Sequence, residues 1–340
     1  MTDGKEHLML IRLSALGDIL MTVPVVDALA RQYPDTKITM VSRPSVASVF
    51  ALLPDNVRFV GVDTKEYRGL AGIHRLAASL RDMRPTTLCD LHDVLRTKYI
   101  RMEFHLSGIP VAHIHKDRKA RAEFIRQQPK RQQVTSMERY AEALEEAGYP
   151  IDTRQMRRLF TADRKREGVG IAPFATHQGK IYPLDRMEKV AETLVAKGIP
   201  VYIFGGGAYE KSIAMQWEER HPGVKSVVGT FPDIASEADF MQGLHVMVTM
   251  DSGNMHLASL TGTPVVSVWG ATHPLGGFLG WGQSMDNVIQ DTSLACRPCS
   301  TYGNKPCMTG DYRCMLNITP ETITDKVLSL CGLDCAQGDR

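Results

Sequence analysis

The chain has 340 residues, which suits two α/β domains better than one, and its 43% of hydrophobic residues is enough for two cores. A net charge of +2 gives no chain-wide electrostatic argument for nucleic-acid binding. No apolar run reaches the roughly 18–20 residues that cross a bilayer, and acidic residues among the first twenty argue against a secretory signal, so we expect a cytoplasmic protein.

Short apolar runs alternate with helical stretches in the first half of the chain. This alternation is typical of a parallel, doubly wound sheet. The basic segment 116–131 is less regular. The elements expected in this half are strands at 8–13, 37–41, 57–62 and 87–91, and helices at 19–33, 70–83 and 136–147.

The polar, charged stretch 154–167 is the best linker candidate, and the alternation restarts after it. The elements expected there are strands at 169–173, 201–204, 224–228, 245–250 and 263–269, and helices at 185–197, 210–220, 255–260 and 320–330. The pattern predicts two Rossmann-like domains that face each other across a cleft. We expect an N-terminal domain at 1–160, a C-terminal domain at 161–319, and a helix and tail at 320–340 that can pack back on the N-terminal domain.

The stretch 245–274 carries the clearest functional signal. A strand is followed by the polar turn Asp251-Ser252-Gly253, then by a helix that contains His256 and ends at Gly262, and then by a second strand. Such a unit directs the free N–H groups of a helix start out of the carboxyl edge of a parallel sheet, where they can hold an anion. The pattern therefore indicates a phosphate site, although a turn of this kind can also bind nothing.

Three further turns carry residues with chemical potential. Gly17 permits close approach of another molecule, and Asp18 is either a helix N-cap or a general base. Lys180, in the same loop as Thr176, either neutralises a phosphate or is simply solvated. Glu210 follows a glycine turn, where a carboxylate can accept ribose hydroxyls. No G-x-G-x-x-G motif follows the first strand, which argues against a dinucleotide site and a dehydrogenase.

Four of the seven cysteines cluster near the C-terminus with the spacing C-x2-C-x7-C-x6-C. Paired thiolates at such separations can close a tetrahedral zinc site. The alternative is a loop with buried or partly oxidised thiols. The four residues are Cys296, Cys299, Cys307 and Cys314.

Taken together, these motifs resemble those of the ADP-heptose:lipopolysaccharide heptosyltransferases, which are family 9 glycosyltransferases with the GT-B fold. Four segments carry the resemblance, at 11–29, 172–183, 204–210 and 250–274, and the cysteine segment 296–321 is also similar. Their order and spacing match the family nearly from end to end.

The resemblance implies a role for the first set of candidates. Asp18, next to Gly17, would take the proton from the acceptor hydroxyl. Lys180 would neutralise the donor diphosphate, with Thr176 nearby, and Glu210 would bind the adenosine ribose.

The resemblance likewise implies roles in the 250–274 segment. Asp251 would contact hydroxyls of the donor sugar, and Ser252, Gly253 and His256 would bind the diphosphate. Ser252 keeps the hydroxyl that many relatives carry on a threonine, whereas the loop 175–179 departs from the better-known members.

The acceptor side is marked by charge. Segment 116–131 holds seven Lys or Arg residues against two acids. A basic face of the N-terminal domain would suit an anionic lipid A–Kdo acceptor at the inner-membrane surface, although charge runs are often only solvated. The candidate acceptor-binding residues are Arg96, Arg118, Lys119 and Arg121.

The leading hypothesis is an inverting glycosyltransferase that moves heptose from ADP-heptose to a lipopolysaccharide inner-core acceptor of the Gram-negative envelope. The chain has no D-x-D pair, so we expect neither a catalytic metal nor another cofactor. The enzyme would be cytoplasmic or peripheral on the inner face of the inner membrane. The alternatives are a related GT-B transferase that uses another nucleotide sugar, and a non-catalytic nucleotide-sugar-binding scaffold.

Overall fold

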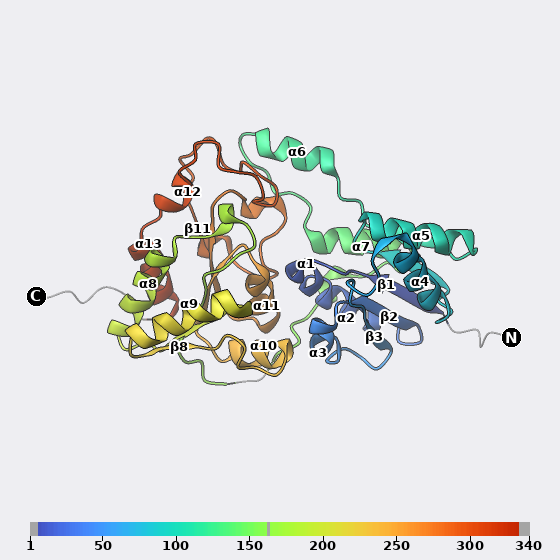
Figure 1. The fold of residues 1–340 in the computed structure, drawn as a ribbon, viewed down its shortest axis with the longest axis horizontal. Coiled ribbons are helices and arrows are strands. Elements are labelled where there is room, and N and C mark those ends of the chain that lie inside the picture. Colours follow the sequence, from blue (N-terminus) through green and yellow to red (C-terminus); the bar gives the residue numbers. More distant parts are fainter. Residues whose placement is uncertain (1–5, 162–163, 333–340) are drawn as a thin grey trace, which may run out of the picture. The chain divides into compact units, whose positions relative to one another are not determined.

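The structure is a computed structural model that describes residues 6–161 and 164–332 (Figure 1). The chain divides into two compact units. Unit 1 comprises Met1–Asp117, Val134–Leu159 and Asp233–Ala235, and unit 2 comprises Arg118–Gln133, Phe160–Pro232 and Ser236–Arg340. The part of the expected tail at 333–340 lies outside the described residues.

Unit 1 is built on a five-stranded sheet in the order β3-β2-β1-β4-β5, in which every neighbouring pair is parallel. The strands are β1 (His7–Ile11), β2 (Lys37–Ser42), β3 (Val57–Gly61), β4 (Thr87–Asp90) and β5 (Val111–His113). The strand order reverses between β1 and β4, and loops after the carboxyl ends of such strands commonly form ligand sites in open α/β sheets.

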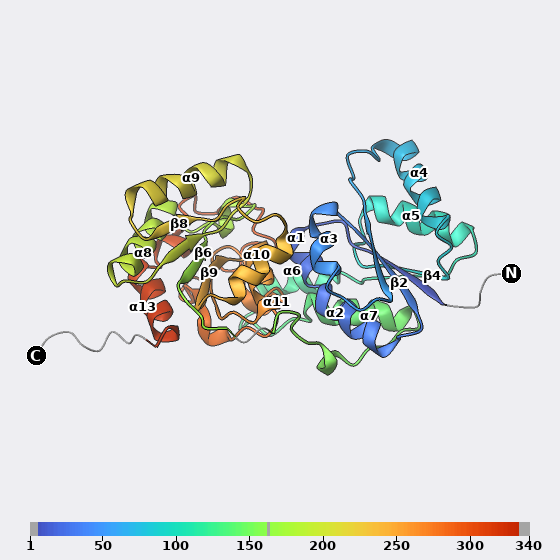
Figure 2. The same cartoon turned by 90° about the horizontal axis from the view of Figure 1, so that it is seen from below.

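Helices cover both faces of this sheet. Figure 2 shows α4 and α5 on one side of the strands and α2 and α7 on the other. The side chains between α4, α5 and the sheet form an apolar core that includes Leu76, Leu80, Ile100 and Phe104. The helices of the unit are α1 (Leu16–Leu20), α2 (Val23–Gln32), α3 (Ala47–Phe50), α4 (Gly69–Arg81), α5 (Leu95–Leu106) and α7 (Ser136–Glu146).

The expected single helix at 19–33 is wrong. The chain forms α1 and α2 as separate helices, and Pro24 lies in the first turn of α2. A proline there has no N–H to donate to the preceding turn, and its ring clashes with the carbonyl four residues back. The break lets α1 carry Asp18 in a short element of its own.

Unit 2 contains a six-stranded sheet in the order β11-β10-β9-β6-β7-β8, again with every neighbouring pair parallel. Its strands are β6 (Val169–Ala172), β7 (Val201–Ile203), β8 (Val224–Ser226), β9 (Val246–Met250), β10 (Val265–Trp269) and β11 (Val288–Gln290). Its helices are α6 (Arg118–Arg126), α8 (Leu184–Ala196), α9 (Gly207–Arg220), α10 (Ile234–Gln242), α11 (Gly253–Thr261), α12 (Arg313–Leu316) and α13 (Pro320–Leu330). The order reverses between β6 and β9, which places the loops after these two strands at the corresponding edge.

Helix α13 belongs to unit 2, and the expected packing of the C-terminal helix and tail on the N-terminal domain stays a prediction. It packs against α8 and against β9 and β10, and both figures show it beside α8. Its apolar residues Ile323, Val327 and Leu328 are buried in the core of unit 2. These residues form the apolar face of the helix, and the sheet of unit 2 supplies the surface that buries this face.

The segment Arg118–Gln133 is a second correction, because it belongs to unit 2 and not to the N-terminal domain. It contains α6, which the irregular sequence pattern did not predict. Phe124 is the buried residue of this helix, and its ring contacts that of His273 edge-on. This buried aromatic side chain in a helix with several charged residues therefore fixes where the segment packs. Among the described helices, none is both long and apolar enough for a membrane span.

Candidate functional site

Asp18 lies at the carboxyl edge of the first sheet, in the third position of the short helix α1. Its Oδ2 atom is 2.6 Å from a guanidinium nitrogen of Arg12 and accepts the Ala15 N–H at 3.3 Å. The side chain is 29% exposed. Ala15 is the N-cap residue, and Asp18 accepts its N–H from the third helical position, so Asp18 does help to cap α1, although not as the N-cap residue itself. The carboxylate is held by a cation and remains accessible.

Arg12 is the residue that orients this carboxylate, and the sequence analysis missed it. It is buried, donates to the Leu91 carbonyl at 2.6 Å and lies over the ring of Tyr140. Burial opposes its charge, but the nearby groups Tyr140, Asp18 and Asp90 outweigh burial and raise the pKa of Arg12. The guanidinium is therefore a fixed positive charge at the edge of the sheet.

His92, in the loop after β4, adds a neutral polar group to the same cluster. Its Nε2 atom is 3.1 Å from Ser14 Oγ, and its Nδ1 atom is buried without a hydrogen-bond partner among the described residues. Burial, followed by the charges of Arg12 and Lys116, lowers the pKa of His92 to about 3. The imidazole is consequently uncharged near neutral pH.

The residues predicted to bind the acceptor fall in both units. Arg96 donates to the Thr64 carbonyl at 3.0 Å and so ties α5 to the loop after β3. Arg118 and Lys119 are exposed at the start of α6 in unit 2. Within unit 1, Arg12 pairs with Asp18, and Lys116, which donates to the Asp93 carbonyl at 3.1 Å, interacts electrostatically with the same carboxylate.

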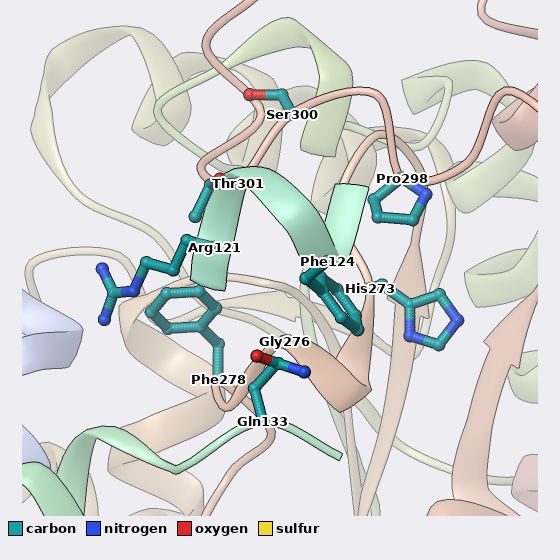
Figure 3. A pocket seen from close by; sticks show the side chains of 9 residues that line it. All are labelled: Arg121, Phe124, Gln133, His273, Gly276, Phe278, Pro298, Ser300 and Thr301. Carbon is teal, nitrogen blue, oxygen red and sulfur yellow. The ribbon is translucent and has the colours of Figure 1, made fainter. Parts of the chain in front are cut away.

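Arg121 has a structural role in unit 2. Figure 3 shows it beside Phe278, in a hollow that is also lined by Phe124 and His273. Its guanidinium lies over the rings of Phe278 and Tyr302 and donates to the Tyr302 hydroxyl. These contacts attach α6 to the loops of unit 2.

Lys180 and Asp251 meet in unit 2, as the sequence suggested for residues of one site. Lys180 Nζ is 2.8 Å from Asp251 Oδ2, which also accepts the Thr272 hydroxyl at 2.8 Å. The side chains are 16% and 6% exposed respectively, so the ion pair is largely shielded from water. Lys180 and Thr272, from two other loops, thus converge on one carboxylate oxygen of Asp251.

Glycine allows the Lys180 loop to approach its neighbour this closely. The Gly179 carbonyl accepts the Ala271 N–H at 2.8 Å. A Cβ atom on Gly179 would lie 2.7 Å from the Ala271 Cβ and 3.1 Å from the Gly303 carbonyl oxygen. A larger residue would therefore separate the two loops that bring Lys180 to Asp251.

The start of α11 has the features of an anion site. Ser252 is the N-cap residue but makes no side-chain capping bond, and its Oγ is buried without a partner among the described residues. Gly253 follows as the first helical residue, and His256 is buried one turn later. Gly262 ends the helix in a left-handed conformation, as predicted. The first turn therefore offers backbone N–H groups and a free hydroxyl.

Two other donor-site candidates make fewer contacts within unit 2. Glu210, in the first turn of α9, accepts the Gly206 N–H at 2.6 Å. Thr176 is exposed in the loop before Lys180. The carboxylate of Glu210 thus closes the glycine turn, and its expected role in binding the ribose stays a prediction.

Arg297 is a buried residue of this region that sequence reasoning missed. It donates to three carbonyls of the loop after β10, those of Trp269, Gly270 and Thr272, at 3.0, 2.5 and 3.1 Å. That loop carries the Thr272 hydroxyl to Asp251. The sequence pattern gives no signal for this arginine. The three carbonyls that accept its hydrogen bonds lie 25 to 28 residues away along the chain.

The four clustered cysteines are free and line one hollow together with Arg297. Burial raises the pKa of Cys314 to about 11, whereas a hydrogen bond from Thr309 lowers that of Cys307. In residues 6–161 and 164–332, the residues whose metal-ligand atoms gather within 4.8 Å of one another are His113, His115 and Glu146. Zinc at the cysteines stays a prediction.

Two all-parallel sheets with helices, each carrying polar groups at the carboxyl ends of its strands, define a two-domain α/β protein of the doubly wound class. Residues 109–306 match the model of glycosyltransferase family 9 (heptosyltransferase). Because the match covers more than half of the chain, the chain belongs to this family of transferases.

Individual relatives are similar over most of their length. Lipopolysaccharide heptosyltransferase 3 of Escherichia coli is 24% identical over 81% of this chain and 85% of its own. Lipopolysaccharide heptosyltransferase 1 of Pseudomonas aeruginosa is 24% identical over 86% of each chain. The structure of E. coli ADP-heptose LPS heptosyltransferase II superposes with a TM-score of 0.69 at 18% identity, covering 95% of this chain and 98% of that one. The expected GT-B fold is confirmed.

Proposed function

We propose that this transferase moves heptose from ADP-heptose to a lipopolysaccharide inner-core acceptor, with inversion at the anomeric carbon and without a catalytic metal. The observation that carries the proposal is the convergence of Lys180, Asp251 and the uncapped start of α11 in unit 2. The names of the curated relatives support lipopolysaccharide as the acceptor, and that of the structural neighbour supports ADP-heptose as the donor.

The donor diphosphate would bind at the start of α11. Ser252 Oγ and the N–H groups of the first turn would hydrogen-bond to its oxygens, and Lys180 would turn from Asp251 to the phosphate. Asp251 would then be free to accept hydroxyls of the donor sugar. Rupture of the bond between the sugar C1 and the phosphate oxygen builds negative charge on ADP, and these preorganised donors would stabilise it. Lys180 and the helix start would thereby supply the charge that a metal ion supplies elsewhere.

Asp18 would act as the general base. Its carboxylate would accept the proton of the acceptor hydroxyl as the hydroxyl oxygen attacks C1, on the face opposite to the departing ADP. Attack from the opposite face inverts the configuration at C1. Arg12 would hold the carboxylate in one orientation.

An anionic acceptor, such as a lipid A–Kdo saccharide at the inner-membrane surface, fits the cations Arg12 and Lys116 beside Asp18. Exposed Arg118 and Lys119 on α6 would favour peripheral contact with an anionic bilayer, at about 1 kcal/mol for each charge near the surface. Reversing both charges, in Arg118→Glu with Lys119→Glu, is expected to weaken sedimentation with anionic liposomes. Unchanged sedimentation would remove the bilayer contact from the proposal.

Transfer itself is tested with ADP-heptose and a lipid A–Kdo acceptor. We expect release of ADP that depends on the acceptor and persists in EDTA, and NMR of the product should show the inverted anomer. Loss of activity in EDTA would contradict metal independence. Transfer from a UDP- or GDP-sugar alone would indicate the related transferase, and ADP binding without transfer would indicate the scaffold.

A further inference from the structure

A pair of histidines lies at the end of β5, outside the candidate transfer site. Side chains two apart on extended backbone project to the same face, so His113 and His115 both face outwards while Ile114 between them is buried. Their ring centroids are 4.6 Å apart. In this arrangement, two imidazoles can bind the same metal ion.

A carboxylate from another element completes the group. Glu146 is the last residue of α7, and its Oε1 atom is 2.8 Å from His115 Nε2. One ligand atom from each of His113, His115 and Glu146 lies within 4.8 Å of the other two. The donor set is therefore two imidazole nitrogens and one carboxylate oxygen.

The backbone that carries these side chains is fixed. His113 pairs with Asp90 in the parallel ladder, and the Ile114 N–H donates to the Asp90 carbonyl at 2.9 Å. Arg139, which is buried on α7, donates to the His115 carbonyl at 3.0 Å and so links the two elements. Ligands on packed strands and helices are held more closely in position than ligands on loops.

The side chains themselves can still adjust. Those of His115 and Glu146 are 55% and 46% exposed. Tetrahedral zinc with nitrogen and oxygen ligands would separate the Nε2 and Oε1 atoms by about 3.4 Å, so a small outward rotation would admit the ion in place of their hydrogen bond. Water would occupy the remaining coordination position.

We propose that His113, His115 and Glu146 form a binding site for a divalent transition metal ion of the zinc class. Two imidazoles select zinc, copper or nickel over magnesium and calcium, which prefer sets of oxygen ligands. These three residues belong to unit 1 and none of them is a donor-binding candidate, so the proposal stands whether or not the chain transfers heptose.

The test is calorimetric titration of Zn²⁺ into the metal-stripped full chain. We expect saturable binding at this site, weakened at least about tenfold by His113→Ala and by Glu146→Gln. His105→Ala is the matched control, because His105 is an exposed histidine on α5, and it should leave binding unchanged. Mg²⁺ should give no saturable heat. Equal affinity in the wild type, His113→Ala and Glu146→Gln would overturn the proposal.

The clustered cysteines could also bind the added Zn²⁺, so a second experiment tests their contribution. A Cys296→Ser, Cys299→Ser variant should retain the histidine site, and its Co²⁺ complex should lack the ultraviolet charge-transfer band of a thiolate ligand. Loss of all Zn²⁺ binding in this variant, with binding intact in His113→Ala, would assign the ion to the cysteines and contradict the proposal. Circular dichroism of each variant checks that a loss of binding is not a loss of fold.

Discussion

The carboxylates of Asp18 and Asp251 each pair with one cation at the carboxyl edge of a parallel sheet, but in opposite settings. In unit 1 the cation is buried and the carboxylate side chain is 29% exposed, so Asp18 is held yet reachable. In unit 2 both partners are largely buried, and a third group, the Thr272 hydroxyl, shares the same oxygen. The first arrangement suits a group that exchanges a proton, and the second suits a charge pair that a bound anion can separate.

The largest effect is expected at Asp18. Asp18→Asn keeps the size of the side chain but removes the base, so kcat should fall by about 10²–10⁴-fold. Asp35→Asn, at an exposed aspartate of unit 1, is the matched control and should leave kcat unchanged. Steady-state rates with ADP-heptose decide the matter, and a variant within twofold of the wild type would show that Asp18 is not the base.

Removing the partner of the buried carboxylate should cost stability. Lys180→Met leaves Asp251 without its cation, and we expect the free energy of unfolding to fall by about 2–4 kcal/mol. Lys189→Met breaks the exposed pair with Glu192 and should cost at most about 1 kcal/mol. Urea denaturation measures both, and equal losses would refute the contrast between a buried and an exposed pair.

A smaller loss is expected from steric pressure on the Lys180 loop. The added methyl group of Gly179→Ala would overlap Ala271, at an expected cost of about 1–3 kcal/mol. Gly206→Ala is the control, because a Cβ there meets no atom within 4 Å. If thermal melts show the same midpoint for both variants, the close approach of the two loops is not required.

The last prediction concerns the pH dependence of stability that His92 confers. Because the pKa of His92 falls from 6.5 unfolded to about 3 folded, the unfolded chain binds the extra proton between these values. Stability from this group is therefore present above pH 6.5 and is lost as the pH falls, with a slope of at most about 1.4 kcal/mol per pH unit.

His92→Asn should flatten the pH dependence of the free energy of unfolding between pH 6.5 and 4. His105→Asn, at an exposed histidine, should not change it. If the free energy of unfolding of His92→Asn depends on pH as steeply as that of the wild type, His92 has a similar pKa in the folded and unfolded chain, which contradicts the prediction.

Local patterns predicted those parts of the fold that local chemistry determines. The strand, polar turn, helix and Gly262 cap of β9 and α11 lie where the sequence placed them, because hydrophobic period and turn residues act within a few positions. The expected parallel α/β alternation is likewise confirmed.

Long-range packing decided the rest. Helix α5 was missed because Ile100 and Phe104 are buried whereas Leu95 and Leu106 on the same helix are exposed, so the apolar residues form no clean stripe. Arg297 was missed for a related reason, since its carbonyl partners are distant in sequence. The sequence placed Lys180 and Asp251 among the candidates, but it gave no sign of the arginine that supports the loop of Thr272 beside them.

The comparison between the two carboxylates rests on a division between donor binding and proton transfer. The most direct measurement is calorimetric titration of ADP into the wild type, Asp18→Asn and Lys180→Met. We predict that Asp18→Asn binds ADP like the wild type, whereas Lys180→Met, which lacks the cation at the diphosphate, binds at least about tenfold more weakly. Equal ADP affinity in the wild type and Lys180→Met would contradict the assignment of unit 2 as the donor site.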